Sequence, residues 1–153
     1  MILMSLTNPS LILNTSYTYE SIIMVTVKDI MSSHLIYGDE NSTVFDIIEL
    51  MARNNVGCVV IMRSGVVKGI VTERDVVRSI YKERFNILDQ KAQNIMSSPV
   101  VTTEEDQTPM LAAYIMRDKN IKKLIVMDDL DVKGIITQTD IVRNMDKVLH
   151  PCG

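Results

Sequence analysis

Apolar residues recur with helical spacing in two separate segments of the chain. In the first segment, Val44, Ile47, Ile48 and Met51 occupy positions i, i+3, i+4 and i+7, which lie on one face of a helix. Residues 109–116 repeat this spacing. Each segment follows a threonine, whose side chain can accept a hydrogen bond from the first turn of a helix. The pattern predicts two amphipathic helices, each with one buried face.

Compact runs rich in β-branched residues predict four strands in two hairpins. Residues 58–62 and 66–71 flank a short turn sequence, and so do residues 124–127 and 132–136. Each hairpin ends in a threonine that can cap a further helix. These final helices are predicted over residues 73–81 and 138–148. Each unit is therefore expected to have the order β-α-β-β-α.

The second half of the chain repeats the first. A shift of 65 residues aligns residues 27–80 with residues 92–145 without a gap, and 17 of the 54 aligned positions are identical. Identity is densest in an Ile-Met-Ser-Ser block and in a block that begins Lys-Gly-Ile and ends in Asp. A unit of about 54 residues is near the lower limit for an independent core, so the two repeats are expected to pack together. The predicted organisation is an N-terminal extension (1–26), a first repeat (27–81), a linker (82–91), a second repeat (92–148) and a C-terminal tail (149–153).

Composition and charge exclude several classes of protein. The chain has 153 residues, 46% of them hydrophobic and 23% charged, as is typical of a soluble globular domain. Its apolar runs are shorter than the roughly 18 residues of a membrane-spanning helix, and its net charge of −3 does not indicate a nucleic-acid partner. The two cysteines and two histidines lack the spacing of a metal site or a catalytic triad. We therefore expect neither an enzyme nor a required metal or cofactor.

The N-terminal extension lacks the basic flank of a secretory signal, because residues 1–26 contain no Lys or Arg. Two interpretations remain open. Either Met24 is the true start of the protein, or the extension is a strand or arm whose apolar residues 11–13 pack on a partner. With no export signal, we expect a cytoplasmic protein.

The order of these motifs resembles the cystathionine β-synthase (CBS) domain. An Asp-Ile-Met-Ser sequence precedes the first helix, and Gly-Ile-Val-Thr-Glu-Arg-Asp runs from the second strand of the hairpin into the final helix. The duplication over residues 27–145 is similar to the tandem CBS pair called a Bateman module. The resemblance implies an α/β (α+β) fold in which two β-α-β-β-α repeats pack through their sheets about a pseudo-two-fold axis. It also implies two clefts that commonly hold AMP, ADP, ATP or S-adenosylmethionine.

The resemblance assigns roles to residues in both repeats. In the family, the aspartate that ends the Gly-x-x-Thr-x-x-Asp motif accepts hydrogen bonds from ribose hydroxyls, which points here to Asp75 and Asp140. A carboxylate suits a ribose because its two oxygens can accept from neighbouring hydroxyls. Thr72, Thr137 and Thr139 match the hydroxyls near the ribose or phosphate. The groups that would hold the adenine correspond to Ile70, Ile135, Val56, Gly57, Cys58, Ile121, Lys122 and Lys123.

Positive charge is distributed unequally between the two repeats. Arg74, Lys122 and Lys123 are candidates to bind a phosphate, because cationic donors form strong, charge-assisted hydrogen bonds. Arg78 and Arg143 follow the two motif aspartates by three residues and are weaker candidates. Each lysine could equally be a solvent-facing residue that protects a strand edge from aggregation.

The Thr-x-x-Asp pattern has a second interpretation. It resembles the capping box of a helix N-terminus, so the motif alone is compatible with a purely structural role. The two roles can coexist in one residue. The duplicated motif favours a ligand role in one or both clefts.

These observations predict a regulatory module that binds an adenosine-containing small molecule and forms a homodimer, as CBS proteins often do. The alternative is a ligand-free scaffold for dimerisation or protein interaction. Nucleic-acid binding is disfavoured because the chain has no basic strip studded with aromatic residues.

Overall fold

The computed structural model describes residues 24–150, and the predictions about residues 1–23 lie outside the described residues. The first repeat contains α1 (Val27–Ile30), β1 (Tyr37–Asp39), α2 (Val44–Asn54), β2 (Cys58–Arg63), β3 (Val66–Thr72) and α3 (Glu73–Glu83). Two 3-10 helices follow, η1 (Arg84–Asp89) and η2 (Ala92–Asn94). The second repeat continues with β4 (Thr102–Glu104), α4 (Pro109–Asp118), β5 (Lys123–Asp128), β6 (Asp131–Thr137), α5 (Gln138–Arg143) and α6 (Met145–Leu149).

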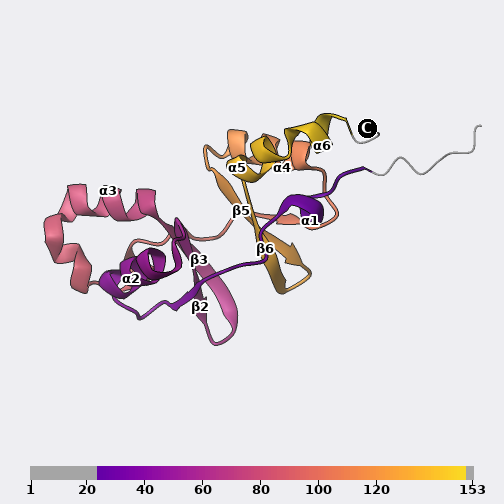
Figure 1. Ribbon diagram of the computed structural model, residues 1–153. Helices are drawn as coiled ribbons and strands as arrows, with labels where there is room; N and C mark the ends of the chain where they lie inside the picture. Colours follow the sequence, from indigo (N-terminus) through magenta and orange to yellow (C-terminus); the bar gives the residue numbers. More distant parts are fainter. Residues whose placement is uncertain (1–23, 151–153) are drawn as a thin grey trace, which may run out of the picture.

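Two three-stranded sheets of the same topology organise the molecule. In the first sheet β1 pairs parallel to β2, and β2 pairs antiparallel to β3. The second sheet repeats this order with β4, β5 and β6, and both hairpins carry a bulge at the equivalent place. Figure 1 shows α2 and α3 beside the first sheet, and α4, α5 and α6 beside the second. Each sheet with its helices is called a half below.

The two sheets pack against each other. A cluster of buried side chains joins Val60 of β2 to Ile125 and Ile135 of β5 and β6. Partly buried residues from both halves, including Ile70 and Val100, surround it. This shared core confirms the predicted packing of two repeats through their sheets.

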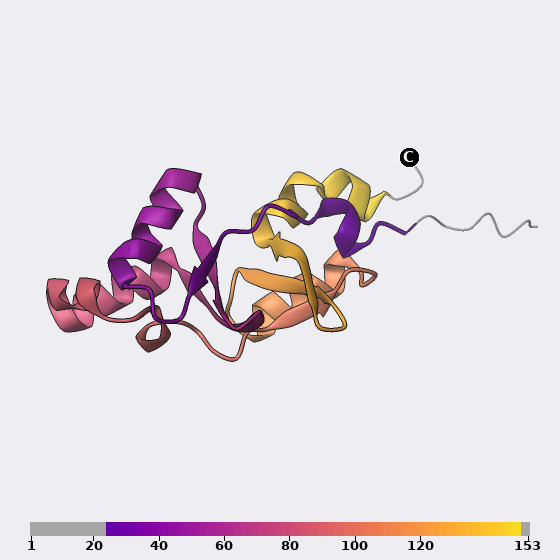
Figure 2. The ribbon, with the colours of Figure 1, turned by 90° about the horizontal axis from the view of Figure 1, so that it is seen from below.

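The first turn of each repeat lies in the opposite half. Val27 and Ile30 of α1 are buried among Ala112 and Met116 of α4, and the Val27 N–H donates to the Gln107 carbonyl at 2.8 Å. Both views show α1 beside the second half (Figures 1 and 2). The start of the second repeat lies in the first half in the same way, because Ala92 is buried in the core of that half. The repeat boundaries in the sequence therefore do not coincide with the halves in space.

The two blocks of highest internal identity contact each other at these crossings. The backbones of Ser97 and Ile70 exchange two hydrogen bonds of 2.9 and 3.1 Å, and Ser32 and Ile135 exchange two of 2.9 Å. Glycine is required beside each bridge. A Cβ on Gly134 would lie 2.5 Å from the Ser32 carbonyl oxygen, a distance that forces the backbone to move.

The predicted helix starts are confirmed. Thr43, Thr108, Thr72 and Thr137 each accept a hydrogen bond from the backbone N–H three residues later. The predicted strands are confirmed within one residue at each end.

The prediction of one helix over residues 138–148 was wrong. The segment contains two short helices, α5 and α6, that meet at Asn144. The backbone of Asn144 leaves the helical region, with φ −109° and ψ 23°, and its side-chain amide donates to the Asp140 carbonyl at 2.9 Å. Asparagine competes in this way for backbone acceptors, which interrupts the helix.

Two other segments are more regular than the pattern indicated. A helical turn, α1, precedes the first strand of the first repeat, where no helix was predicted. The linker contains η1, and Ile87 within it is fully buried while Phe85 is exposed. The apolar residues of this segment, Phe85, Ile87 and Leu88, do not follow a helical period, so the sequence did not indicate this helix.

Candidate ligand-binding cleft between the halves

Asp75 stands at the junction of β3 and α3, where it performs the capping role. Its Oδ2 atom accepts hydrogen bonds from the Thr72 N–H at 2.8 Å and the Thr72 hydroxyl at 2.6 Å. Within the described residues, Oδ1 accepts one longer bond of 3.3 Å, from the Ser97 hydroxyl. One carboxylate oxygen is therefore occupied by the cap, and the other retains capacity to accept.

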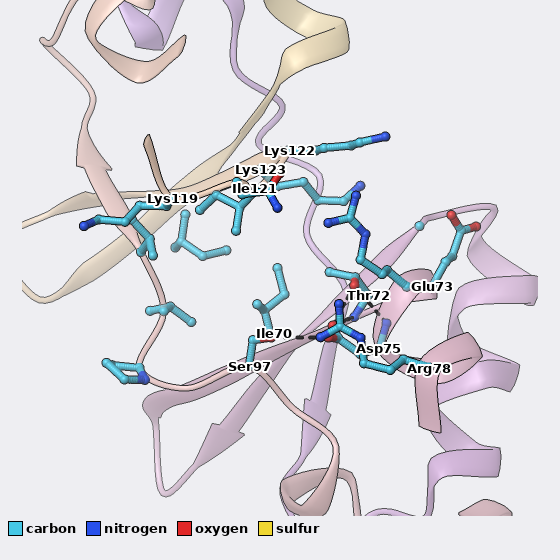
Figure 3. Close-up of a pocket in the computed structure, with 17 residues that line it drawn as sticks. Ile70, Thr72, Glu73, Asp75, Arg78, Ser97, Lys119, Ile121, Lys122 and Lys123 are labelled. Carbon is cyan, nitrogen blue, oxygen red and sulfur yellow. Dashed lines mark hydrogen bonds between the residues drawn. The ribbon is translucent and has the colours of Figure 1, made fainter. Parts of the chain in front are cut away.

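A cavity of about 500 Å³ lies beside this aspartate, between the two halves. It is called the Asp75 cleft below. Figure 3 shows Thr72, Asp75 and Ser97 on one side of it, and Ile121 and Lys123 on the other. The cleft therefore joins the motif of the first repeat to the loop that precedes β5 of the second.

Cationic side chains outnumber acidic ones around the cleft. The cationic residues are Arg74, Arg78, Lys119, Lys122 and Lys123, and the acidic ones are Glu73 and Asp75. Lys119 pairs with Asp118 at 3.3 Å, whereas the other four cations form no ion pair within residues 24–150. Unpaired cations that converge on a cavity create a positive potential that attracts an anion.

The floor of the cleft is apolar. Ile70 and Ile125 come from strands of the two halves, and Val100 and Val101 come from the segment that crosses between them. Together with Ile121, these side chains form a surface suited to a flat, largely apolar ring system.

The predicted ligand residues divide between this cleft and other places. Eight of them line it: Gly57, Ile70, Thr72, Arg74, Asp75, Ile121, Lys122 and Lys123. Six do not: Val56, Cys58, Ile135, Thr137, Thr139 and Asp140. Of the two weaker candidates, Arg78 lines the cleft and Arg143 does not. The cleft therefore draws its residues from both repeats. The crossing of the chain brings Arg74 of one repeat together with Lys122 and Lys123 of the other.

The residues of the second motif form an equivalent arrangement on the other side of the pseudo-two-fold axis. Asp140 Oδ2 accepts from the Thr137 N–H at 2.8 Å and from its hydroxyl at 2.6 Å. Ile135 is buried between the sheets, and Thr139 is exposed on α5. Cys58 is partly buried, and desolvation raises the pKa of its thiol, although the charge of Lys123 opposes this.

The sequence analysis missed eight residues that line the cleft: Glu73, Ser97, Pro99, Val100, Val101, Lys119, Asn120 and Ile125. Ser97 belongs to the repeated Ile-Met-Ser-Ser block, so its recurrence was a usable signal. Lys119 and Asn120 follow a helix with no distinguishing pattern. Only the tertiary structure brings them to the cleft.

Both repeats, each with its Thr-x-x-Asp motif, match a known protein family. Residues 27–82 and 92–147 each match the family model of the CBS domain. The chain belongs to the CBS-domain family. The resemblance seen in the sequence is thereby confirmed.

Relatives and solved structures agree with a CBS pair. MK0525, an uncharacterised protein of Methanopyrus kandleri, is 35% identical over 121 residues, which cover 78% of this chain and 62% of that protein. The CBS-domain protein ATU1752 of Agrobacterium tumefaciens has the same fold, with a TM-score of 0.75 at 24% identity over 80% of this chain and 95% of that one. The CBS pair of protein MJ0100, solved with 5′-methylthioadenosine and S-adenosyl-L-methionine, has a TM-score of 0.73 at 27% identity and covers 80% of this chain and 96% of that chain.

In several relatives the CBS pair makes up only part of the protein's length. The chain spans 62%, 45% and 31% of the lengths of three curated relatives that it matches. Among the described residues, no helix is long and apolar enough to cross a membrane, and no group of three His, Cys, Asp or Glu side chains could hold a metal ion.

Proposed function

We propose that this CBS pair is a regulatory module, not an enzyme, that binds an adenosine-containing ligand in the Asp75 cleft. The observation that carries the proposal is the placement of Asp75, whose Oδ1 atom keeps acceptor capacity beside a cavity of about 500 Å³. A cavity of this volume suits a small organic ligand.

Each part of such a ligand has a chemical counterpart in the cleft. The ribose hydroxyls donate to Asp75 Oδ1, taking the place of the long bond from Ser97. The adenine lies on the apolar floor that includes Ile70 and Ile121. The relative MJ0100, whose CBS pair was solved with 5′-methylthioadenosine and S-adenosyl-L-methionine, supports the adenosyl class of ligand.

The test is isothermal titration calorimetry of the purified chain with AMP, ATP and S-adenosylmethionine. Asp75→Ala is expected to lower the affinity for the bound ligand by at least tenfold, or about 1.4 kcal/mol. Asp46→Ala is the matched control, because Thr43 and Asp46 form the same capping box at the start of α2 and lie outside the cleft. Equal affinity in wild type and a folded Asp75→Ala variant would falsify the assignment.

We also propose that the outer helices mediate a homodimer. Met110, Leu111 and Tyr114 of α4 and Val142 of α5 are all more than 40% exposed. Apolar side chains that recur on neighbouring helices are typical of an association surface. In light scattering, a Tyr114→Glu, Val142→Glu variant is expected to have half the mass of the wild type. A monomeric wild type would contradict the proposal.

A further inference from the structure

A second, smaller cavity lies in the second half, next to the first described residue. Its volume is about 230 Å³, and it is lined by Met24, Val25, Thr108, Pro109, Met110 and Val148. It is called the Met24 groove below. Five of these six side chains are apolar, and Val25 and Val148 also pack against the core of the second half. The groove is therefore an apolar extension of that core.

The equivalent place in the first half is the start of α2. The 65-residue shift maps residues 108–110 of the groove onto residues 43–45. There the Val44 N–H donates to the Gln90 carbonyl at 2.8 Å, so the segment that precedes the second repeat reaches α2. This segment forms η1, which packs on both α2 and α3, and its Ile87 is fully buried. The first half is therefore covered beside α2 by the residues that precede the second repeat.

The chain enters the two repeats in the same way. The Ala92 N–H donates to the Ser42 carbonyl at 2.8 Å, and its counterpart, the Val27 N–H, donates to the Gln107 carbonyl at 2.8 Å. Each repeat therefore begins at the same place on the opposite half. The residues before the first repeat follow the equivalent path as far as they are described, because residues 24–25 line the groove beside α4.

The sequence before the first repeat supplies side chains that match those of η1. The same shift matches Ile22 to Ile87 and Ile23 to Leu88. Of residues 1–23, 12 are apolar or aromatic and one is charged. Segments with few apolar residues and many charges stay in water, and this one has the opposite composition. An apolar segment that ends at an apolar groove gains free energy by burying its side chains there.

We propose that residues 19–23 bind in the Met24 groove of their own chain. Ile22 is buried there as Ile87 is buried in the first half. The connection favours this occupant, because Ile22 is two residues from Met24 and the segment needs no linker to reach the groove. The segment closes the second half and holds α4 and α6 together. Its docking does not depend on ligand binding and goes beyond the proposed function.

The groove borders the surface that we propose for the homodimer. Met110 lines the groove and also belongs to that surface, whereas Leu111, Tyr114 and Val142 do not line the groove. A second copy that covered Met110 would therefore compete with residues 19–23, and the test must separate these two occupants.

Photocrosslinking of the full chain identifies the occupant. A photoreactive amino acid in place of Met110, which is 58% exposed, is expected to link to residues 19–23. A mixture of isotopically labelled and unlabelled protein shows by mass spectrometry whether each link lies within one chain. The control places the photoreactive group at Phe45, which is equivalent to Met110 in the first half and 55% exposed. From there no link to residues 19–23 is expected.

Two crosslinking results would overturn the proposal. The first is the absence of any link from position 110 to residues 19–23. The second is a link that forms only between labelled and unlabelled chains. In particular, a link to α4 of a second copy would assign the groove to the homodimer.

Thermal unfolding of point variants measures what the buried side chain contributes. Ile22→Ser is expected to lower the Tm by about 4 °C or more, as is Ile87→Ser. Leu13→Ser removes an apolar side chain of the same extension outside the matched residues, and is the control, with an expected change below about 2 °C. Combining Ile22→Ser with Val148→Ala is expected to lower the Tm by less than the sum of the two shifts, because both remove one contact. An unchanged Tm in Ile22→Ser, or strictly additive shifts, would contradict the docking.

Discussion

At the scale of single residues, the contact between the first strand and the following helix is made by different side chains in the two halves. A Cβ on Gly38 of β1 would lie 2.6 Å from the Cδ1 atom of Ile47. The equivalent pair in the second half is Thr103 and Ala112, so a larger strand residue faces a smaller helix residue. Thr103 is buried, and its hydroxyl has no hydrogen-bond partner within the described residues. Side-chain volume is therefore matched across each strand and helix.

Gly38→Ala is expected to lower the free energy of unfolding by about 1–3 kcal/mol, because the new methyl group overpacks a dense core. Combining it with Ile47→Ala is expected to be less destabilising than the sum of the two single changes, since the shortened side chain makes room. Urea unfolding of the four proteins measures this. Strict additivity would show that the two positions do not share one space.

The capping box at the start of α2 makes stability depend on pH in the acid range. Hydrogen bonds from the side chain and the backbone N–H of Thr43 hold the pKa of Asp46 below its usual value of 3.8. Because the folded pKa is the lower one, the stabilisation is complete above the usual value and is lost as the pH falls through the folded pKa.

We therefore expect Asp46→Asn to be less stable than the wild type at pH 6 and to approach it at pH 3. Urea unfolding at the two pH values measures the gap. A gap of the same size at both values would mean that the charge of Asp46 does not contribute to the cap.

At the scale of elements, the segments around Ser32 and Ser97 cross to the other half and hydrogen-bond to the β-hairpin there. A Cβ on Gly134 would lie 2.5 Å from the backbone oxygen of Ser32. A Cβ on Gly69 would lie 2.6 Å from the flexible side chain of Met96 and 2.9 Å from the backbone oxygen of Ser97, so its backbone clash is the milder one. A side chain can rotate away from a new methyl group more easily than a hydrogen-bonded backbone can move. The two glycines are thus unequal in their tolerance of substitution.

Gly134→Ala is expected to be more destabilising than Gly69→Ala, with a loss of about 1–3 kcal/mol for the larger effect. The comparison is made by thermal and urea unfolding, with Ser33→Ala at an exposed position of the same crossing as the control. The reverse order would indicate that the bridge between Ser32 and Ile135 adapts readily.

At the scale of the whole molecule, the exchanged first turns make the halves depend on one another. Val27 and Ile30 complete the second core, and Ala92 completes the first. The shared cluster around Val60 and Ile125 closes only when both sheets are present. Neither repeat contains all of the apolar surface that covers its own core.

Fragments 24–90 and 91–150 are therefore expected to be unfolded when prepared separately, and to regain structure when mixed. Circular dichroism and proteolysis of each fragment and of the mixture test this, with the intact chain as the reference. A cooperative thermal transition in either isolated fragment would contradict the expectation.

The sequence by itself determined the local structure. Apolar periodicity placed the helices and strands, and the threonine caps placed the helix starts, because these features depend on neighbours within a few residues. The duplicated motifs also indicated the family, and the family resemblance indicated the packing through the sheets. The break at Asn144 and the helix around Ile87 escaped prediction, because each depends on one side chain rather than on a pattern.

Only the tertiary structure decided which residues share a cleft. The crossing of the two repeats joins Arg74 and Asp75 of the first repeat to Lys122 and Lys123 of the second, whereas Asp140 does not line this cleft. Hydrophobic periodicity records which side of a helix or strand is buried but not which distant segment covers it. The net charge of the Asp75 cleft therefore depends on the fold, although the sequence supplies each charged residue.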